Sequence, residues 1–422
     1  MLASEKAYIV LYLCFWALAR PACAAELLVL LSSKGLKSSH STFLSDLRAS
    51  GFSTDIQLLS SNSLRLQSWG RWLYDGVVVL AQGEAELGGA LDSSYLVELV
   101  DSGRGLFVAA DEGASPSIRE TMTDLGTDML SKGTQVQDYI SHDSSQGPAA
   151  LLTSGVHMPA ITGDVGAPIL FRGTGATLSP NATLTAPVLA PAATAVAGSG
   201  SSALAGPNLV LATAMQSRTN ARTFFVASVD ALSDAAFSTQ PSNAAGGAEG
   251  GASKTGNRAL AAEAAKWAFK RKGMLRLSNF EHRRSGDAAP PPLATYTIND
   301  QIHVSLDLHE NDGDDWQPHV TENLQAQFVM LDPYIRKRMQ HTGNGHYELN
   351  VRAPDKYGIF KWVIEYSAPG YSKVALEEVT PLRPLQHDQF PRFVLQAYPY
   401  YAALMSVSVG FFVVVLFVLY HK

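Results

Sequence analysis

A run of twenty uncharged residues near the C-terminus, 401–420, constrains this chain more than any other feature. Twenty apolar residues form a helix about 30 Å long, which matches the hydrocarbon core of a bilayer. Tyrosines stand at both ends of the run, at Tyr398, Tyr400 and Tyr420, and such rings favour the membrane–water interface. The sequence therefore predicts a transmembrane helix over residues 398–420, a preceding stalk at 381–397 and a cytosolic tail of two residues, 421–422.

The N-terminus carries a shorter apolar run, residues 7–19, which is followed by Ala22, Cys23 and Ala24. Thirteen residues are too few to span a bilayer, and small residues after such a run are typical of a cleaved secretory signal. We predict a signal peptide at 1–24 and a single-pass type I topology with the bulk of the chain lumenal. Both cysteines, Cys14 and Cys23, would then be removed, which excludes a thiol enzyme or a thiolate zinc protein.

Small residues recur every four positions within the predicted transmembrane helix, at Ala402, Ser406 and Gly410. This spacing places them on one helix face, and small residues let two helices approach closely in lipid. The functional interpretation is a packing face for partner helices. The alternative is coincidence in a composition rich in Ala, Ser and Gly.

The region from 25 to 275 predicts a lumenal α/β domain. Apolar runs at 27–31, 77–81 and 106–110 show no alternation, and helix-like segments at 41–50 and 93–101 separate them. Such a pattern is typical of a parallel sheet covered on both faces, as in Rossmann- or flavodoxin-like folds. The first strand leads into Ser-Ser-Lys-Gly rather than a phosphate-binding glycine motif, so we predict no bound cofactor.

Two segments of this domain, 176–207 and 240–256, are dominated by Ala, Ser, Thr, Gly and Pro and are predicted to be low-complexity loops. The first contains Asn181-Ala182-Thr183, the sequon of the chain. Asn181 is therefore a candidate N-glycan acceptor in a lumenal protein.

After three prolines at 290–292 the period of apolar residues changes to two. Residues 302–308, 324–330, 347–351 and 360–366 all alternate between apolar and polar side chains, which predicts an antiparallel, immunoglobulin-like β-sandwich over 293–380. The stretch 355–360 resembles the turn that leads into the penultimate strand of immunoglobulin-like domains.

One acidic motif could carry chemistry. Asp312 and Asp314 form an Asp-x-Asp, a pattern with which many glycosyltransferases hold a divalent metal. It follows a strand of the predicted sandwich, so a solvated hairpin loop is the favoured interpretation, and the sequence predicts no catalytic, cofactor or metal site. The net charge of −6 without a basic block gives no indication of nucleic-acid binding.

Several motifs, in order along the chain, resemble the non-catalytic subunit family of dolichyl-diphosphooligosaccharide–protein glycosyltransferase. They are residues 74–80 (Tyr-Asp-Gly-Val-Val-Val-Leu), 168–175 (Pro-Ile-Leu-Phe-Arg-Gly-Thr-Gly), 220–225 (Asn-Ala-Arg-Thr-Phe-Phe), 267–270 (Trp-Ala-Phe-Lys), 286–291 (Gly-Asp-Ala-Ala-Pro-Pro), 383–387 (Arg-Pro-Leu-Gln-His) and 397–402 (Ala-Tyr-Pro-Tyr-Tyr-Ala). The last two are the most specific. The loops at 176–207 and 243–256 and the short tail depart from the family pattern.

The resemblance implies a structural subunit of the oligosaccharyltransferase complex in the endoplasmic reticulum membrane, which transfers a preassembled glycan to Asn in Asn-x-Ser/Thr. Its implied partners are the catalytic multispanning subunit, a small defender-against-death-type subunit and ribophorin-type subunits. Two alternatives stay open: a glycosyltransferase that acts through Asp312 and Asp314, and a type I receptor or lectin whose α/β domain binds a lumenal ligand.

Overall fold

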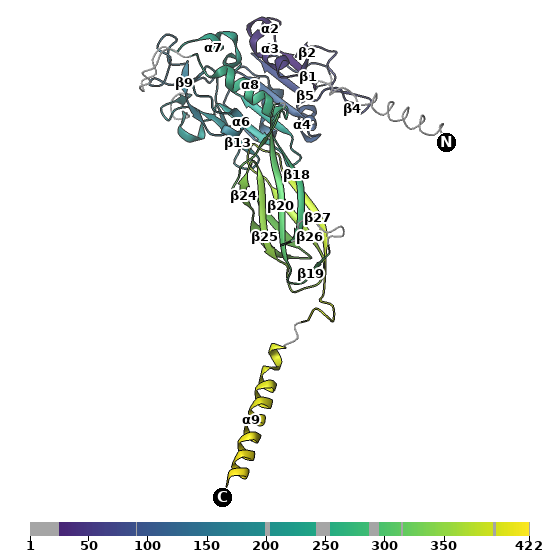
Figure 1. Cartoon of the computed structure of the whole chain (residues 1–422). Helices are drawn as coiled ribbons and strands as arrows, with labels where there is room; N and C mark the ends of the chain where they lie inside the picture. The colour runs from purple at the N-terminus through teal and green to yellow at the C-terminus, as the bar shows by residue number, and fades with distance from the viewer. Residues whose placement is uncertain are drawn as a thin grey trace, which may run out of the picture.

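The computed structural model describes residues 25–89, 91–198, 203–241, 254–286, 295–313, 315–390 and 394–421. Figure 1 shows three parts in chain order: an α/β domain, a domain of long strands, and the helix α9. The predicted signal peptide, both cysteines and the second residue of the predicted tail lie outside the described residues.

The α/β domain is built on an eight-stranded sheet with the order β10-β13-β16-β17-β6-β5-β1-β2. Five adjacent strands pair in parallel, which confirms the predicted parallel sheet for this part. In chain order they read 2-1-3-4-5, one of the two common orders of doubly wound sheets. These strands are β1 (Glu26–Leu31), β2 (Ser53–Leu58), β5 (Gly76–Ala81), β6 (Gly105–Ala110) and β17 (Arg222–Val226).

Helices bury the central strands, and all residues of β5 and β6 are buried. Phe43 of α3 lies 5.6 Å from the ring of Phe107 in β6, which in turn lies 5.3 Å from Phe224 in β17. This aromatic row joins a helix to two strands from different parts of the chain. The helices of eight residues or more in this domain are α3 (Ser41–Ala49), α4 (Ser93–Asp101), α5 (Pro116–Asp124) and α8 (Asn257–Ala268).

The N-terminus of α3 is capped by a residue distant in sequence. The carboxylate of Asp234, the first residue of the short helix α7 (Asp234–Ser238), accepts hydrogen bonds from the backbone N–H groups of Ser41 and Thr42 at 3.0 and 2.8 Å. Partial burial of Asp234 favours a higher pKa, but the hydrogen bonds from Ser41 and Thr42 outweigh it and lower the pKa. The charged carboxylate thus satisfies backbone donors that a helix start leaves free.

The sheet is mixed rather than wholly parallel, which corrects the prediction for its far end. Strands β16 (Ala212–Gln216), β13 (Thr185–Ala190) and β10 (Gly155–Val156) extend it in antiparallel pairing. The predicted low-complexity loop at 176–207 is therefore wrong in part, since it contains β13 and the short strands β12 (Ala176–Leu178), β14 (Val196–Ala197) and β15 (Leu204–Ala205). Small side chains hid the strand in the sequence, although Val188 and Leu189 are fully buried.

Most of the second predicted loop, residues 242–253, lies outside the described residues. The helix that follows it, α8, ends at Ala268. The chain then enters strand β18 (Lys272–Arg284), which the sequence did not predict. Its pairing with β20 is interrupted by two register shifts, and this irregularity explains why residues 272–284 show no regular alternation.

The second domain consists of two sheets with a shared core, and all but one of their strand pairs are antiparallel, as the alternation predicts. One sheet has the order β18-β20-β25-β24 with β21 paired to β20, and the other has the order β19-β27-β26-β22-β23. Ile302, Val304, Leu306 and Leu308 all point into the core and are buried. Further strands are β19 (Tyr296–Thr297), β20 (Gln301–Asp312), β21 (Asp315–Pro318), β22 (Gln325–Val329), β23 (Pro333–Arg338), β24 (Gln340–Gly343), β25 (His346–Arg352), β26 (Gly358–Tyr366) and β27 (Val374–Arg383).

Tyr357 stands directly before the penultimate strand, β26, where the immunoglobulin-like turn was expected. Its side chain is 67% exposed, so it does not form the buried tyrosine corner of immunoglobulin-like domains. Pairing between β19 and β27 is parallel, whereas the other paired strands of the two sheets are antiparallel.

A buried histidine should make this domain sensitive to acid. His282 is only 5% exposed, and its Nδ1 atom lies 2.6 Å from the hydroxyl of Tyr296. Burial lowers the pKa of His282, and the carboxylate of Glu378, 3.6 Å from Nε2, opposes this shift only in part. The unfolded chain therefore binds this proton at higher pH than the folded chain, so the free energy of unfolding should fall as the pH drops below about 6.5.

We expect the full-length protein in detergent to unfold at lower temperature near about pH 5.5 than near about pH 7.5. The His282→Gln variant should be less stable overall, but its unfolding temperature should change less between the two pH values. Thermal unfolding followed by circular dichroism measures both effects. An unchanged pH dependence in the variant would show that other groups dominate the acid response.

Candidate functional site

Helix α9 (Tyr398–Tyr420) coincides with the predicted transmembrane helix. Within the described residues, the helical stretch Leu395–Tyr420 is the one that is long and apolar enough to cross a membrane. None of its side chains is buried against the rest of the chain. A bilayer or a partner must therefore cover this apolar surface.

The predicted packing face lies on α9 as the four-residue spacing implies. Ala402, Ser406 and Gly410 are all exposed. The hydroxyl of Ser406 donates a hydrogen bond to the carbonyl of Ala403 at 2.8 Å, so this polar group is satisfied within the helix. A Cβ atom at Gly410 would meet nothing within 4 Å. No other part of the chain that the structure describes covers these three residues.

A buried arginine joins the α/β domain to the domain of long strands. Arg222, the first residue of β17, is fully buried and donates hydrogen bonds to the carbonyls of Trp267, Lys272 and Gly273 at 3.0, 2.5 and 2.8 Å. Its guanidinium also lies 5.0 Å from the centre of the Trp267 ring. Burial lowers the pKa of Arg222 to about 10, so the side chain still carries its charge at neutral pH. It therefore holds the carboxyl end of α8 to the start of β18, next to the negative end of the helix dipole.

The loop between β26 and β27 docks against this point. The indole Nε1 of Trp267 donates to the carbonyl of Gly370 at 2.7 Å, and the backbone N–H of Ser372 donates to the carbonyl of Gly273 at 2.9 Å. Gly273 has a φ of +67°, and a Cβ atom there would lie 2.6 Å from the carbonyl oxygen of Gly370. Both the backbone angle and the close approach of the two segments require glycine at position 273.

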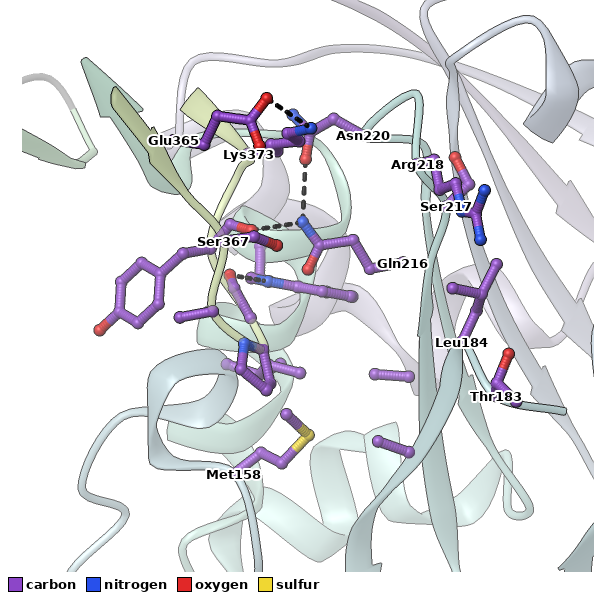
Figure 2. A pocket seen from close by; sticks show the side chains of 18 residues that line it. Met158, Thr183, Leu184, Gln216, Ser217, Arg218, Asn220, Glu365, Ser367 and Lys373 are labelled. Carbon is purple, nitrogen blue, oxygen red and sulfur yellow. Dashed lines mark hydrogen bonds and ion pairs between the residues drawn. The ribbon is translucent and has the colours of Figure 1, made fainter. Parts of the chain in front are cut away.

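A cavity of about 780 Å³ lies between the two domains. Ala186 and Ala214 of the sheet line it, together with Ile161 and the indole of Trp267. In Figure 2, Thr183 and Leu184 lie on one side of the cavity, and Met158 and Ser367 lie on the opposite side. Its volume falls in the range of sites for small ligands.

The polar groups of the cavity are mostly uncharged. The side-chain amide of Gln216 donates to Asn220 at 3.1 Å and to the carbonyl of Tyr371 at 2.6 Å, which links the domains across the cavity wall. Glu365 and Lys373 lie 3.6 Å apart and neutralise each other. Arg218 also lines the cavity, so this wall combines amide and hydroxyl groups with one further cationic side chain.

The sequon lies at the edge of this cavity. Asn181 is exposed in the turn between β12 and β13, and its carbonyl accepts a hydrogen bond from the N–H of Thr183 at 3.1 Å. Thr183 and Leu184 themselves line the cavity. The structure thus brings the sequence-predicted acceptor close to the domain junction.

The acidic motif closes a β-hairpin. Asp312 and Asp315 are opposite each other at the ends of β20 and β21, and Asp312 is exposed. Asp314 lies outside the described residues. In the part of the chain that the structure describes, no group of three or more His, Cys, Asp or Glu residues is placed to hold a metal ion.

Sequence reasoning missed a buried polar cluster near the junction. His319 is 7% exposed, and its Nδ1 lies 2.8 Å from the carboxylate of Glu310 and its Nε2 3.4 Å from the hydroxyl of Tyr366. The ring of Tyr371 lies 4.8 Å from that of His319. These partners belong to positions far apart in sequence, so no local motif indicates them. Their mutual contacts give the cluster a structural role in the sandwich.

Two sequence profiles match most of the chain. The profile of the OST48 N-terminal domain matches residues 18–271, and that of the OST48 middle domain matches residues 282–422. The gap between them contains the first ten residues of β18. The match supports a division of the chain before α9 into two domains at the junction described above.

Relatives in three eukaryotes carry the name dolichyl-diphosphooligosaccharide–protein glycosyltransferase 48 kDa subunit. The Arabidopsis thaliana protein is 36% identical over 410 residues, covering 94% of this chain and 93% of its own. The Drosophila melanogaster protein is 30% identical over 405 residues (92% and 90%), and the Danio rerio protein is 30% identical over 398 residues (92% and 89%). Among solved structures, a ThuA-like protein from Parabacteroides merdae gives a TM-score of 0.30 at 12% identity, over 58% of this chain and 90% of its own, which is too weak to carry an argument.

Proposed function

Since this chain belongs to the OST48 family, we propose that it is a non-catalytic assembly subunit of the oligosaccharyltransferase complex in the endoplasmic reticulum membrane. The complex transfers a preassembled oligosaccharide from dolichyl diphosphate to Asn in Asn-x-Ser/Thr of nascent chains. In this proposal the two domains lie in the lumen, α9 crosses the membrane once, and a separate multispanning subunit performs the transfer.

The observation that carries the proposal is the exposed apolar surface of α9 with its face of small residues. In lipid, helices associate through close packing and not through the hydrophobic effect, so a face that includes Gly410 favours contact with another helix. A helix that served only as an anchor would not need such a face. The partners we propose are the multispanning catalytic subunit, a small defender-against-death-type subunit and ribophorin-type subunits.

The positions of the polar residues support a non-catalytic role. Arg222 bonds to backbone carbonyls, and His319 bonds to the carboxylate of Glu310, so both buried side chains have partners within the fold. Asp312, which the alternative glycosyltransferase interpretation requires, is exposed at the end of a hairpin. A metal-dependent transferase instead uses carboxylates that converge in a cleft with its substrate.

Affinity purification of the full-length protein in mild detergent tests this proposal. The eluate should contain the multispanning subunit and should transfer glycan from a lipid-linked donor to an Asn-x-Thr peptide. Fractions with this chain alone should be inactive. Transfer activity that persists after removal of all partners and disappears in Asp312→Ala would support the glycosyltransferase alternative instead.

The same purified protein distinguishes the assembly subunit from the other alternative, a receptor or lectin. A receptor or lectin should bind free oligosaccharide saturably in the absence of partners, which glycan-array binding or calorimetry measures. We expect no saturable binding by the isolated subunit. Saturable binding without co-purified partners would replace the assembly role by a receptor role.

A further inference from the structure

The turn that carries the sequon presents its asparagine to solvent beside a cavity. Asn181 is exposed, and the sequon Asn181-Ala182-Thr183 contains no proline at its middle position. A backbone hydrogen bond from Thr183 to Asn181 holds the turn in a compact form. Leu184, the next residue, is 47% exposed and lines the cavity, so the cavity opens to solvent on the side of the sequon.

The cavity wall suits the chemistry of a sugar. Sugar rings combine hydroxyl groups with apolar faces, and they bind to amide and hydroxyl side chains around a small apolar floor. Here Ala186 and Ala214 form the apolar floor, and the wall carries the hydroxyls of Ser217 and Ser367, the side-chain carbonyl of Gln216 and the guanidinium of Arg218. The amide N–H groups of Gln216 are already donated to Asn220 and Tyr371. Ser367 belongs to the second domain, whereas the sequon belongs to the first, so an occupant attached at Asn181 would touch both domains.

We propose that Asn181 carries an N-linked glycan whose first sugars lie in the mouth of the interdomain cavity and brace the loop of residues 367–373. The proposal rests on the lumenal location of the chain in the proposed function. The donor is a polyprenyl-diphosphate-linked oligosaccharide. A bond forms between Nδ2 of Asn181 and C1 of the first sugar, the bond from C1 to the diphosphate oxygen breaks, the amide gives up one proton, and the lipid diphosphate leaves.

The position of the proposed glycan predicts an effect on the opening of the loop 367–373. The loop 367–373 is held to the first domain by the hydrogen bonds of Trp267 to Gly370 and of Gln216 to Tyr371. Sugars seated beside these bonds would shield them from water and resist the opening of the junction. Removal of the glycan should therefore speed local opening of the loop without unfolding either domain.

The modification is tested by mobility on gels before and after treatment with a glycan-removing amidase. The full-length wild type, expressed in eukaryotic cells and extracted from membranes, should shift on treatment. Asn181→Gln and Thr183→Ala should not shift. Thr183→Ser is the matched control, because serine keeps the sequon, and it should shift like the wild type. A wild type that does not shift would overturn the proposal.

The binding of the first sugars in the cavity mouth is tested by hydrogen–deuterium exchange of residues 367–373. Exchange should be several-fold faster in Asn181→Gln and in amidase-treated wild type than in the untreated wild type and in Thr183→Ser. Equal exchange rates with and without glycan would mean that the glycan points into solvent, and would overturn the seating. The proposed role as a subunit is tested by a different result. Absence of co-purified partners would contradict that role, whatever the gel shift shows.

Discussion

Replacing Arg222 by alanine should destabilise the two domains that precede α9 by about 3–5 kcal/mol. The guanidinium donates hydrogen bonds to the carbonyls of Trp267, Lys272 and Gly273, and bonds from a charged donor are worth about 1.5–3 kcal/mol each. The variant would also lose the contact with the Trp267 ring and leave a void at a fully buried position. The loss falls on the junction, so both domains should become less stable together.

Thermal and urea unfolding of the full-length protein in detergent measure this loss. The matched control is Arg218→Ala, because Arg218 lies four residues away and is exposed, and its unfolding temperature should match the wild type within error. Arg222→Lys should also lose much of this stability, since an ammonium group cannot reproduce the planar guanidinium that reaches three carbonyls. Equal stability of Arg222→Ala and Arg218→Ala would contradict the role of Arg222 at the junction.

Replacing Gly410 by leucine should reduce incorporation of the protein into the proposed complex several-fold while the two domains that precede α9 stay folded. Gly410 offers open space on the small-residue face, and a leucine there would hold a partner helix away. The helix itself should persist, because leucine favours a helix more than glycine does. Co-purification of partners, quantified by mass spectrometry against the amount of this chain, gives the measurement.

Ser408→Leu is the control for size and hydrophobicity. Ser408 lies two residues from Gly410 and therefore on the opposite side of α9, and its hydroxyl bonds to its own helix at the carbonyl of Leu404. We expect it to leave partner recovery unchanged. If Ser408→Leu and Gly410→Leu weakened recovery equally, or if neither did, the packing face would not be the one defined by Ala402, Ser406 and Gly410.

Sequence reasoning predicted the elements whose signal is local. The predicted helix at 93–101 coincides with α4, and the alternating residues from Ile302 to Leu308 form the inner face of β20. Burial leaves a periodic trace in such segments, because one or both faces must be apolar along the whole element. Strands β13 and β18 were missed because small residues in one and register shifts in the other blur this trace.

The candidate sites also differ in whether a local sequence pattern indicates them. The proposed packing face of α9 rests on a four-residue spacing, so the prediction of Ala402, Ser406 and Gly410 needs the sequence alone. The role of Arg222 could not be predicted, because a charged residue beside an apolar strand gives no indication of which carbonyls it binds. Its partners at 267, 272 and 273 come from a different helix and strand.

The sequence by itself indicated an apolar helix long enough to cross a membrane, the parallel part of an α/β sheet and a domain of alternating strands, because length, hydropathy and periodicity act within a few turns of chain. Only the tertiary structure decided that Thr183, Gln216 and Ser367 share one cavity and that Asn181 stands at its edge. These residues are brought together by the docking of two domains through Arg222, Trp267 and Gly273. That docking depends on the close fit of surfaces from distant segments, which no local pattern in the sequence records.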